Sequence, residues 1–243
     1  MNDTEFARCA LDFQYFVTKY IKVSHPQRGL IDFETYPYHE RMIDAYSKHK
    51  FIVLKKFRQG GFTTTTLAWL VWKAIFQTDQ QIVWVSKTDR EAVIASSIVH
   101  SFIMNLPEWL APVIGKDNAH EKSFVDTNSR IRFISPYGLM GIDYNTLVFD
   151  ECAYIRNMEE HWKLALITAS CGKATCIAIS TPNGRGNWFE KTYTGAVEGI
   201  NEFYPVSINY LEHPNYQSVE FAINMRNNLG LAGWTQEIIA SFD

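Results

Sequence analysis

Short apolar runs alternate with longer segments of helical periodicity, and this alternation constrains the fold more than any other feature of the sequence. The runs are strand-sized and cover residues 51–54, 82–85, 131–134, 146–149 and 176–179. The helical segments cover residues 64–77, 89–105 and 158–169. Alternating strands and helices form a mostly parallel sheet, and nearly continuous apolar strands are covered on both faces. The pattern predicts an α/β fold with a central sheet flanked by helices.

Weaker signals divide the rest of the chain. An N-terminal helical segment leads to Pro37, and a new helix is expected to begin at about His39. Turn residues indicate a loop at 182–186. The last part of the chain predicts one more strand, a proline-containing turn and a helix or two. We therefore expect a core at residues 1–202 and a small, lid-like appended subdomain at residues 203–243.

Composition and charge exclude several classes of protein. Hydrophobic residues make up 47% of the 243 positions and charged residues 20%, which is typical of a globular chain and unlike a disordered one. The net charge of -3 argues against a domain that coats nucleic acid over its whole surface, although a local basic patch stays open. No export signal or membrane-length apolar stretch is evident, and the four cysteines lack CxxC spacing. We expect a cytosolic chain with reduced thiols and no membrane contact.

The most informative local segment is a glycine-containing turn between a strand and a helix. Residues 56–64 read KFRQGGFTT. In such a turn, backbone N–H groups can approach phosphate oxygens, and the helix N-terminus adds the positive end of its dipole. The segment departs from the phosphate-loop pattern GxxxxGK[ST], because Lys56 stands at the first glycine position and Phe62 at the lysine position. The alternative interpretation is an ordinary strand-to-helix turn capped by threonine.

A phosphate site in this loop needs a cation and a metal ligand. Lys55, Lys56 and Arg58 are close enough in sequence to supply the cation, and we choose Lys56. The hydroxyl of Thr63 is suited to bind Mg²⁺. Further contacts with the nucleotide are expected from Gln59, Gly60, Gly61, Phe62, Thr63 and Thr64.

Two carboxylates, Asp150 and Glu151, directly follow the apolar run at 146–149. The carboxyl ends of parallel strands are where ligands bind in open α/β sheets. Asp150 would hold Mg²⁺, and Glu151 would orient and deprotonate an attacking water. A solvated loop could carry the same pair. The order of a strand, a phosphate loop, a helix and a later strand ending in Asp-Glu favours a nucleoside triphosphatase.

Small polar side chains follow the strand predicted at 176–179. Ser180, Thr181 and Asn183 would lie beside the nucleotide, where they could sense the γ-phosphate and relay its loss. The alternative is that they only satisfy backbone groups at a tight turn.

Taken together, these segments resemble the large terminase subunits of tailed phages. Residues 56–64 are similar to the deviant Walker A loop of that family. Residues 148–153 are similar to its Walker B strand with the catalytic glutamate, and residues 180–184 to its coupling motif. The three motifs appear in the family's order.

Two further segments extend the resemblance to nearly the whole chain. The sequence around Tyr38 and His39 resembles the family's adenine-recognition segment, with His39 where glutamine is frequent. Residues 234–242 resemble the pattern that closes the ATPase region. The family's nuclease domain would follow, and the acidic clusters of such a domain are not found in this sequence.

The resemblance implies a P-loop NTPase fold of the RecA-like, ASCE type and a Mg²⁺-dependent ATPase. Glu151 and Arg58 would be its catalytic residues. Hydrolysis would pull double-stranded viral DNA into a procapsid in the host cytoplasm. The partners would be the portal protein, the small terminase subunit and further copies in a pentameric ring, with a monomer expected in isolation. A neighbouring subunit would donate an arginine; Arg130 and Arg90 are candidates, although both are also typical surface charges.

Two other functions stay open. One is a helicase-like translocase, which normally needs a second motor domain for which this chain has no room. The other is a catalytically degenerate scaffold, suggested by Phe62 and opposed by the presence of Thr63, Asp150 and Glu151.

Overall fold

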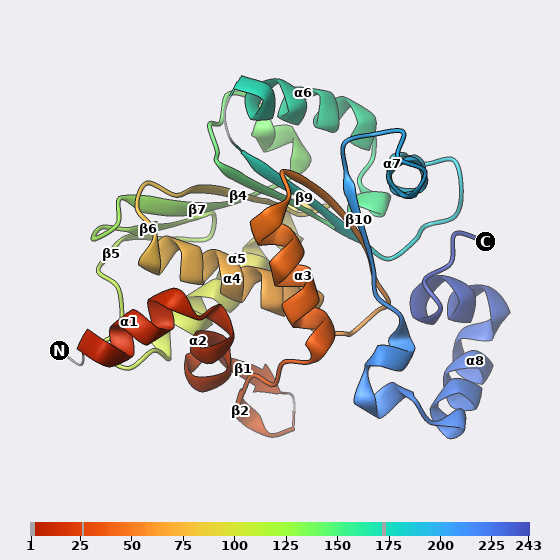
Figure 1. The fold of residues 1–243 in the computed structure, drawn as a ribbon, viewed down its shortest axis with the longest axis horizontal. Coiled ribbons are helices and arrows are strands. Elements are labelled where there is room, and N and C mark those ends of the chain that lie inside the picture. The colour runs from red at the N-terminus through yellow and green to blue at the C-terminus, as the bar shows by residue number, and fades with distance from the viewer. Residues whose placement is uncertain (1–2, 26, 172–173) are drawn as a thin grey trace.

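The computed structural model describes residues 3–25, 27–171 and 174–243, and its centre is a single large sheet (Figure 1). The strand order is β10-β3-β9-β8-β4-β7-β6-β5. The strands are β3 (Phe51–Lys55), β4 (Gln81–Val85), β5 (Ile114–Asp117), β6 (Glu121–Phe124), β7 (Ser129–Ile134), β8 (Thr146–Asp150), β9 (Thr175–Ser180) and β10 (Tyr204–Ser207). Pairing is parallel from β10 to β7 and antiparallel at β6 and β5. The predicted mostly parallel sheet is confirmed.

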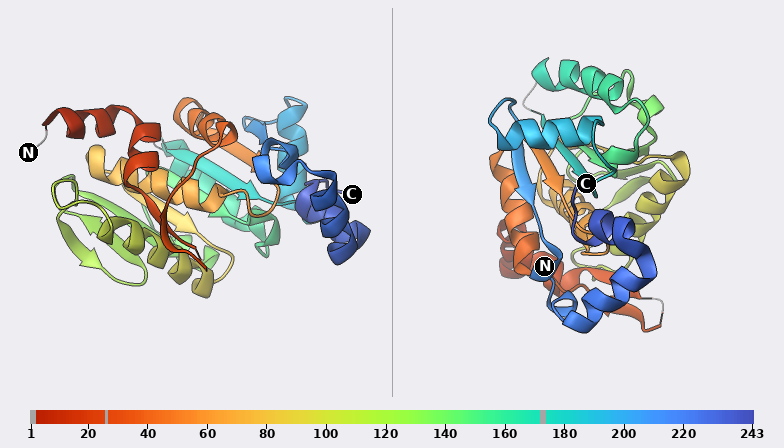
Figure 2. Two further views of the ribbon diagram at one scale, coloured as in Figure 1. Left: turned by 90° about the horizontal axis from the view of Figure 1, so that it is seen from below. Right: turned by 90° about the vertical axis from the view of Figure 1, so that its right-hand side faces the viewer.

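Helices cover both faces of the sheet, as Figures 1 and 2 show. One face is covered by α1 (Asp3–Leu11), α2 (Phe13–Tyr20), α3 (Pro37–Lys48), α4 (Phe62–Phe76) and α5 (Asp89–Met104), and the other by α6 (Met158–Cys171) and α7 (Trp188–Val197). Strand β3 belongs to both cores: Ile52 and Leu54 join one apolar cluster, and Phe51 and Val53 join the other. Because side chains alternate along a strand, burial on both faces produces the continuous apolar runs in the sequence.

The C-terminal segment, residues 209–243, packs at one end of the sheet beside the turn between β3 and α4 (Figure 1). It contains the short helical turns η3 (Tyr210–Glu212) and η4 (Pro214–Tyr216), the helix α8 (Val219–Gly233) and the π-helical turn η5 (Trp234–Ile238). Helix α8 buries none of its residues, and Gly230 interrupts it with φ 69° and ψ 173°. The buried residues of this segment lie outside α8: Trp234 and Ile238 in η5, Ala240 after it, and His213 between η3 and η4.

Two short antiparallel pairs were not expected from the sequence. One is the hairpin of β1 (Lys22–His25) and β2 (Gly29–Asp32), and the other is the β5–β6 arm at the sheet edge. Their strands are only four residues long and largely polar, so they carry little periodicity.

Several boundaries also differ from the predicted ones. Helix α3 begins at Pro37, because a proline is favourable in the first turn of a helix. Helix α4 begins at Phe62, directly after Gly61. The strand expected in the last part of the chain is β10, which pairs with β3 inside the main sheet, so the sheet continues past residue 202. The division into 1–202 and 203–243 stays a prediction. Among the described residues, no helix is long and apolar enough to cross a bilayer.

Candidate functional site

The turn between β3 and α4 is shaped by two glycines. Gly61 has φ 77°, in the left-handed region that glycine adopts without cost. A Cβ added at Gly60 would lie 2.6 Å from the Phe57 ring, and it would meet the Phe62 ring even more closely. Both rings are buried. Phe62, which stands where a phosphate-loop lysine is usual, therefore serves to pack the turn.

The carbonyl group of Gly60 is held from behind by α3. Tyr38 donates its hydroxyl hydrogen to Gly60 O at 3.0 Å, and His39 Nε2 lies 2.7 Å from the same oxygen. His39 Nδ1 accepts the backbone N–H of Tyr36 at 3.1 Å, so Nε2 carries the proton and donates to Gly60. Burial lowers the pKa of His39 to about 4, which keeps the ring neutral.

This arrangement bears on the predicted adenine contacts. Tyr38 and His39 are each only 1% exposed, and both are bound to the back of the phosphate loop. A base could stack on them only after these contacts break. In the structure they act as a support for the loop.

The acidic pair lies at the carboxyl end of β8, facing the loop. Thr63 Oγ1 is 3.3 Å from Asp150 Oδ2 and 3.4 Å from Asp150 Oδ1. Burial and the adjacent charge of Glu151 raise the pKa of Asp150. A divalent cation would offset both effects, and hydroxyl and carboxylate oxygens are the ligands that Mg²⁺ prefers. The two predicted metal ligands are thus adjacent.

Glu151 is held on both of its carboxylate oxygens. Lys56 is buried, and its Nζ forms an ion pair with Glu151 Oε1. Glu151 Oε2 accepts from the backbone N–H of Thr181 at 3.2 Å and from Ser180 Oγ at 3.3 Å. The backbone of Glu151 has φ 50°, uncommon outside glycine. The structure therefore joins the loop, the acidic pair and the end of β9 through one carboxylate.

The remaining predicted residues lie farther from this centre. Asn183 donates to Ala153 O at 3.2 Å and does not reach Glu151. The side chain of Arg58 is 63% exposed and forms an ion pair with Glu237 in the C-terminal segment, with 3.1 Å between Nη1 and Oε2. In the structure it thus points away from Asp150 and toward η5.

The candidate arginines Arg130 and Arg90 lie at opposite ends of the parallel strands. Arg130 lies near the start of β7, beside Gln81 at the start of β4, whereas the phosphate loop lies at the other ends of the parallel strands. Arg90 is exposed in the first turn of α5. This helix follows β4 and so begins at the carboxyl ends of the strands, where the loop also lies.

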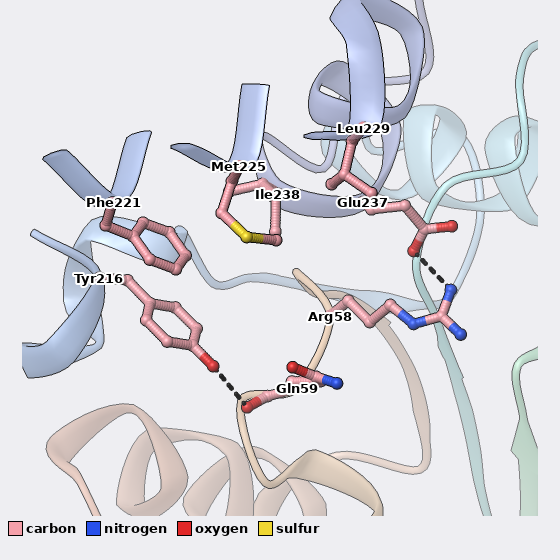
Figure 3. A pocket seen from close by; sticks show the side chains of 8 residues that line it. All are labelled: Arg58, Gln59, Tyr216, Phe221, Met225, Leu229, Glu237 and Ile238. Atoms are coloured by element: carbon pink, nitrogen blue, oxygen red, sulfur yellow. Dashed lines mark hydrogen bonds and ion pairs between the residues drawn. The ribbon is translucent and has the colours of Figure 1, made fainter. Parts of the chain in front are cut away.

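Cavities in the described part of the chain border the loop. The phosphate-loop cavity, about 200 Å³, is lined by Lys56, Glu151 and the loop residues from Arg58 to Thr64. A second cavity of about 170 Å³ lies between the acidic pair and α5. The third, about 400 Å³ and here called the C-terminal cavity, separates the loop from α8 and η5 (Figure 3). Its lining residues in the C-terminal segment were not singled out as site residues from the sequence: those on η4 and α8 follow no motif, and Glu237 and Ile238 belong to the closing pattern, which assigned them no role.

A metal ion at this place would have few ligands from the described residues. Within the described residues, no group of three or more His, Cys, Asp or Glu could hold a metal ion. Thr63 and Asp150 supply two oxygens, so a cation here would need further oxygens from phosphate groups and water, as Mg²⁺ usually has. The arrangement can therefore bind a polyphosphate and a hard cation together.

Comparison with solved structures shows which proteins share this fold. The ATPase domain of the Thermus phage P74-26 large terminase is 19% identical with a TM-score of 0.71, covering 87% of this chain and 95% of that one. The HK97 bacteriophage large terminase is 13% identical with a TM-score of 0.76, covering 96% of this chain and 55% of that one. A large terminase of a thermophilic bacteriophage in complex with ADP is 13% identical with a TM-score of 0.67, covering 86% and 54%.

These identities establish a shared fold, and this chain spans about half of the longer proteins. The model of the family described as terminase large subunit, T4-like-virus type, N-terminal matches residues 53–240, which include the loop, the acidic pair and the C-terminal cavity. The chain belongs to the family of N-terminal domains of terminase large subunits.

Proposed function

We propose that this domain hydrolyses ATP with Mg²⁺ and that the hydrolysis drives viral double-stranded DNA into a procapsid. The observation that carries the proposal is the convergence of Lys56, Thr63, Asp150 and Glu151 at one edge of the sheet. Membership in the terminase family and the ADP complex of a similar structure support it.

Each side chain has a distinct task in this proposal. Backbone N–H groups of the loop and the N-terminus of α4 bind the phosphates. Thr63 and Asp150 would hold Mg²⁺, which would neutralise charge on the phosphate oxygens. Lys56 stabilises the negative charge that develops during phosphoryl transfer, and Glu151 takes a proton from the attacking water.

Glu151 must leave its partner before it can act as a base. Its ion pair with Lys56 occupies one of the two carboxylate oxygens. Phosphate oxygens compete for the same ammonium group, so ligand binding weakens this pair. Ser180 and Thr181 then remain as the contacts that keep the carboxylate oriented.

Phosphate release from Mg²⁺ and ATP by the purified chain tests the proposal. Glu151→Gln should reduce the rate by about a hundredfold or more, because a general base contributes on that order. Lys56→Ala should have a similar effect. Lys55→Met is the matched control, since Lys55 Nζ lies 5.0 Å from the Tyr193 ring, away from the loop. Equal rates in wild type, Glu151→Gln and Lys56→Ala would refute the site.

The partners belong to the whole motor and are part of the same proposal. We propose that its partners are the portal protein, the small terminase subunit, double-stranded DNA and further copies of the chain in a pentameric ring, as in the family, and that it acts in the host cytoplasm. Sedimentation of the isolated chain should show a monomer. Phosphate release should rise when duplex DNA is added, and a rise with single strands only would favour a helicase-like enzyme instead.

A further inference from the structure

One side-chain amide of the C-terminal segment reaches the residues behind the acidic pair. Gln236 lies in η5, and its Nε2 donates to the hydroxyl oxygen of Tyr154 at 2.7 Å. Glu237 Oε1 lies 3.5 Å from the same nitrogen, and a carboxylate at this distance favours the donor end of the amide on this side. The contact joins residues that are 82 positions apart, so the docking of η5 creates it.

Tyr154 stands between η5 and the backbone that follows β9. It ends η2 (Cys152–Tyr154), the short helical turn directly after the acidic pair. Its hydroxyl donates to the carbonyl oxygen of Pro182 at 3.1 Å and lies 3.2 Å from Thr181 Oγ1. A tyrosine hydroxyl has a single hydrogen, and a carbonyl group can only accept. Pro182 therefore takes that hydrogen, and the hydroxyl oxygen accepts from Gln236.

Thr181 connects this hydroxyl to the carboxylate of Glu151. The backbone N–H of Thr181 donates to Glu151 Oε2 at 3.2 Å, and Thr181 Oγ1 lies 3.5 Å from the same oxygen. Because Tyr154 bonds to Thr181 and to the residue after it, it fixes the backbone from which this N–H points. The orientation of Glu151 therefore depends on Tyr154 as well as on its direct partners.

This dependence grows when phosphates occupy the loop. Lys56 holds Glu151 Oε1, and phosphate oxygens compete for its ammonium group. Glu151 is then kept in place through Oε2 alone, by Ser180 and by Thr181. A reacting group has to be held within about half an ångström of its productive position, and hydrogen bonds behind it provide that precision. Tyr154 supplies such support to one of the two remaining partners.

We infer that Gln236 is a positioning residue for ATP hydrolysis and acts on Glu151 through Tyr154 and Thr181. The inference rests on the proposed function, since it requires Glu151 to be the base. The base is then aligned only while η5 is docked, because Gln236 belongs to that turn. Gln236 does not line the three cavities described above. A change at Gln236 should therefore lower the rate of hydrolysis and leave the affinity for ATP intact.

Steady-state phosphate release from Mg²⁺ and ATP tests the inference. Gln236→Met keeps the length of the side chain but cannot donate a hydrogen bond, and Tyr154→Phe removes only the hydroxyl. Each should lower kcat about tenfold with KM unchanged, because a hydrogen bond contributes on that order. The double variant should be no slower than the slower single variant, since both changes break one chain of contacts. Values of kcat are expressed per ATP-binding site, counted with a non-hydrolysable analogue, so that unfolded chains do not lower them.

Thr235→Val is the matched control, because it removes a hydroxyl from η5 that is not among the partners of Tyr154 within the described residues. It should keep the kcat and KM of wild type. Unchanged kcat in Gln236→Met would overturn the inference and leave the ATPase proposal standing. Losses that multiply in the double variant, or a raised KM in either single variant, would also overturn it, since η5 would then act by another route. A wild-type chain that releases no phosphate would refute the ATPase proposal and this inference together.

Discussion

The phosphate loop and the C-terminal segment lie side by side, yet they are built in opposite ways. Gly60 is enclosed by two buried rings, and two buried side chains hold its carbonyl group. Helix α8, on the other side of the C-terminal cavity, buries no residue at all and is interrupted at Gly230. Fixed geometry is concentrated where phosphates must be placed within a few tenths of an ångström, whereas the facing wall can adjust.

The largest effect should come from filling the space at Gly60. Gly60→Ala places a methyl group against the rings of Phe57 and Phe62, neither of which has room to retreat. Overpacking of this kind should lower the free energy of unfolding by about 3 kcal/mol, measured with urea. Gly141→Ala is the control, since its φ is 75° but nothing lies within 4 Å. A loss at Gly60 no larger than at Gly141 would mean that the loop is as adjustable as α8.

The second largest effect should be a loss of folding stability when the pH is lowered. The folded-state pKa of His39 is about 4, below the ordinary value of 6.5. The unfolded chain therefore binds a proton first as the pH falls. The stability that neutral His39 contributes is complete above pH 6.5 and declines from there toward pH 4.

We expect a loss of about 2 kcal/mol between pH 7 and pH 5 from this group. His39→Gln removes the titrating ring, so its stability should fall less over the same interval in urea titrations. His213, which neighbours Tyr38 and has a lowered pKa of its own, contributes to both chains and cancels in the difference. Parallel pH profiles for the two chains would exclude His39 as the acid-sensitive group.

A smaller effect is expected at Gly230 in the C-terminal segment. Its φ and ψ fall in a region that is essentially restricted to glycine, but a Cβ there would meet nothing within 4 Å. Gly230→Ala should therefore lower the free energy of unfolding by only about 1 kcal/mol, because α8 can relax. Hydrogen exchange should rise in α8 and stay unchanged in α4. Asn228→Ala, at an exposed helical position, is the control.

The smallest effect should be the loss of the ion pair between Arg58 and Glu237. The side chain of Arg58 is 63% exposed, so water and salt screen the attraction. Glu237→Gln should change the free energy of unfolding by less than about 1 kcal/mol. A larger change that persists in 1 M salt would show that the C-terminal segment is attached to the loop as firmly as α3 is.

The sequence predicted the parts of the molecule that follow a local pattern. Buried parallel strands produce continuous apolar runs, and the loop and the Asp150–Glu151 pair occur at strand ends, so their neighbourhood follows from the topology of the sheet. The β5–β6 arm was not predicted, because its short, polar strands have no distinctive hydrophobic period.

Contacts between distant segments could not be predicted in this way. The support of Gly60 by His39 depends on the packing of α3 against the loop, which no spacing reveals. The C-terminal cavity joins Gln59 to Tyr216 and Phe221, more than 150 positions later in the chain. The pairing of Lys56 with Glu151 likewise required the geometry, although each residue had been identified separately.

The contact between α3 and the Gly60 carbonyl sets the electrical polarity of the loop. In a trans peptide the C=O and the following N–H point in opposite directions. Since Tyr38 and His39 draw the Gly60 oxygen toward the protein interior, the N–H of Gly61 is directed outward, toward an incoming anion. A lone pair facing that anion would repel it. Tyr38 and His39 thus orient the loop so that the N–H donor of Gly61 faces the ligand, although neither residue needs to contact the ligand itself.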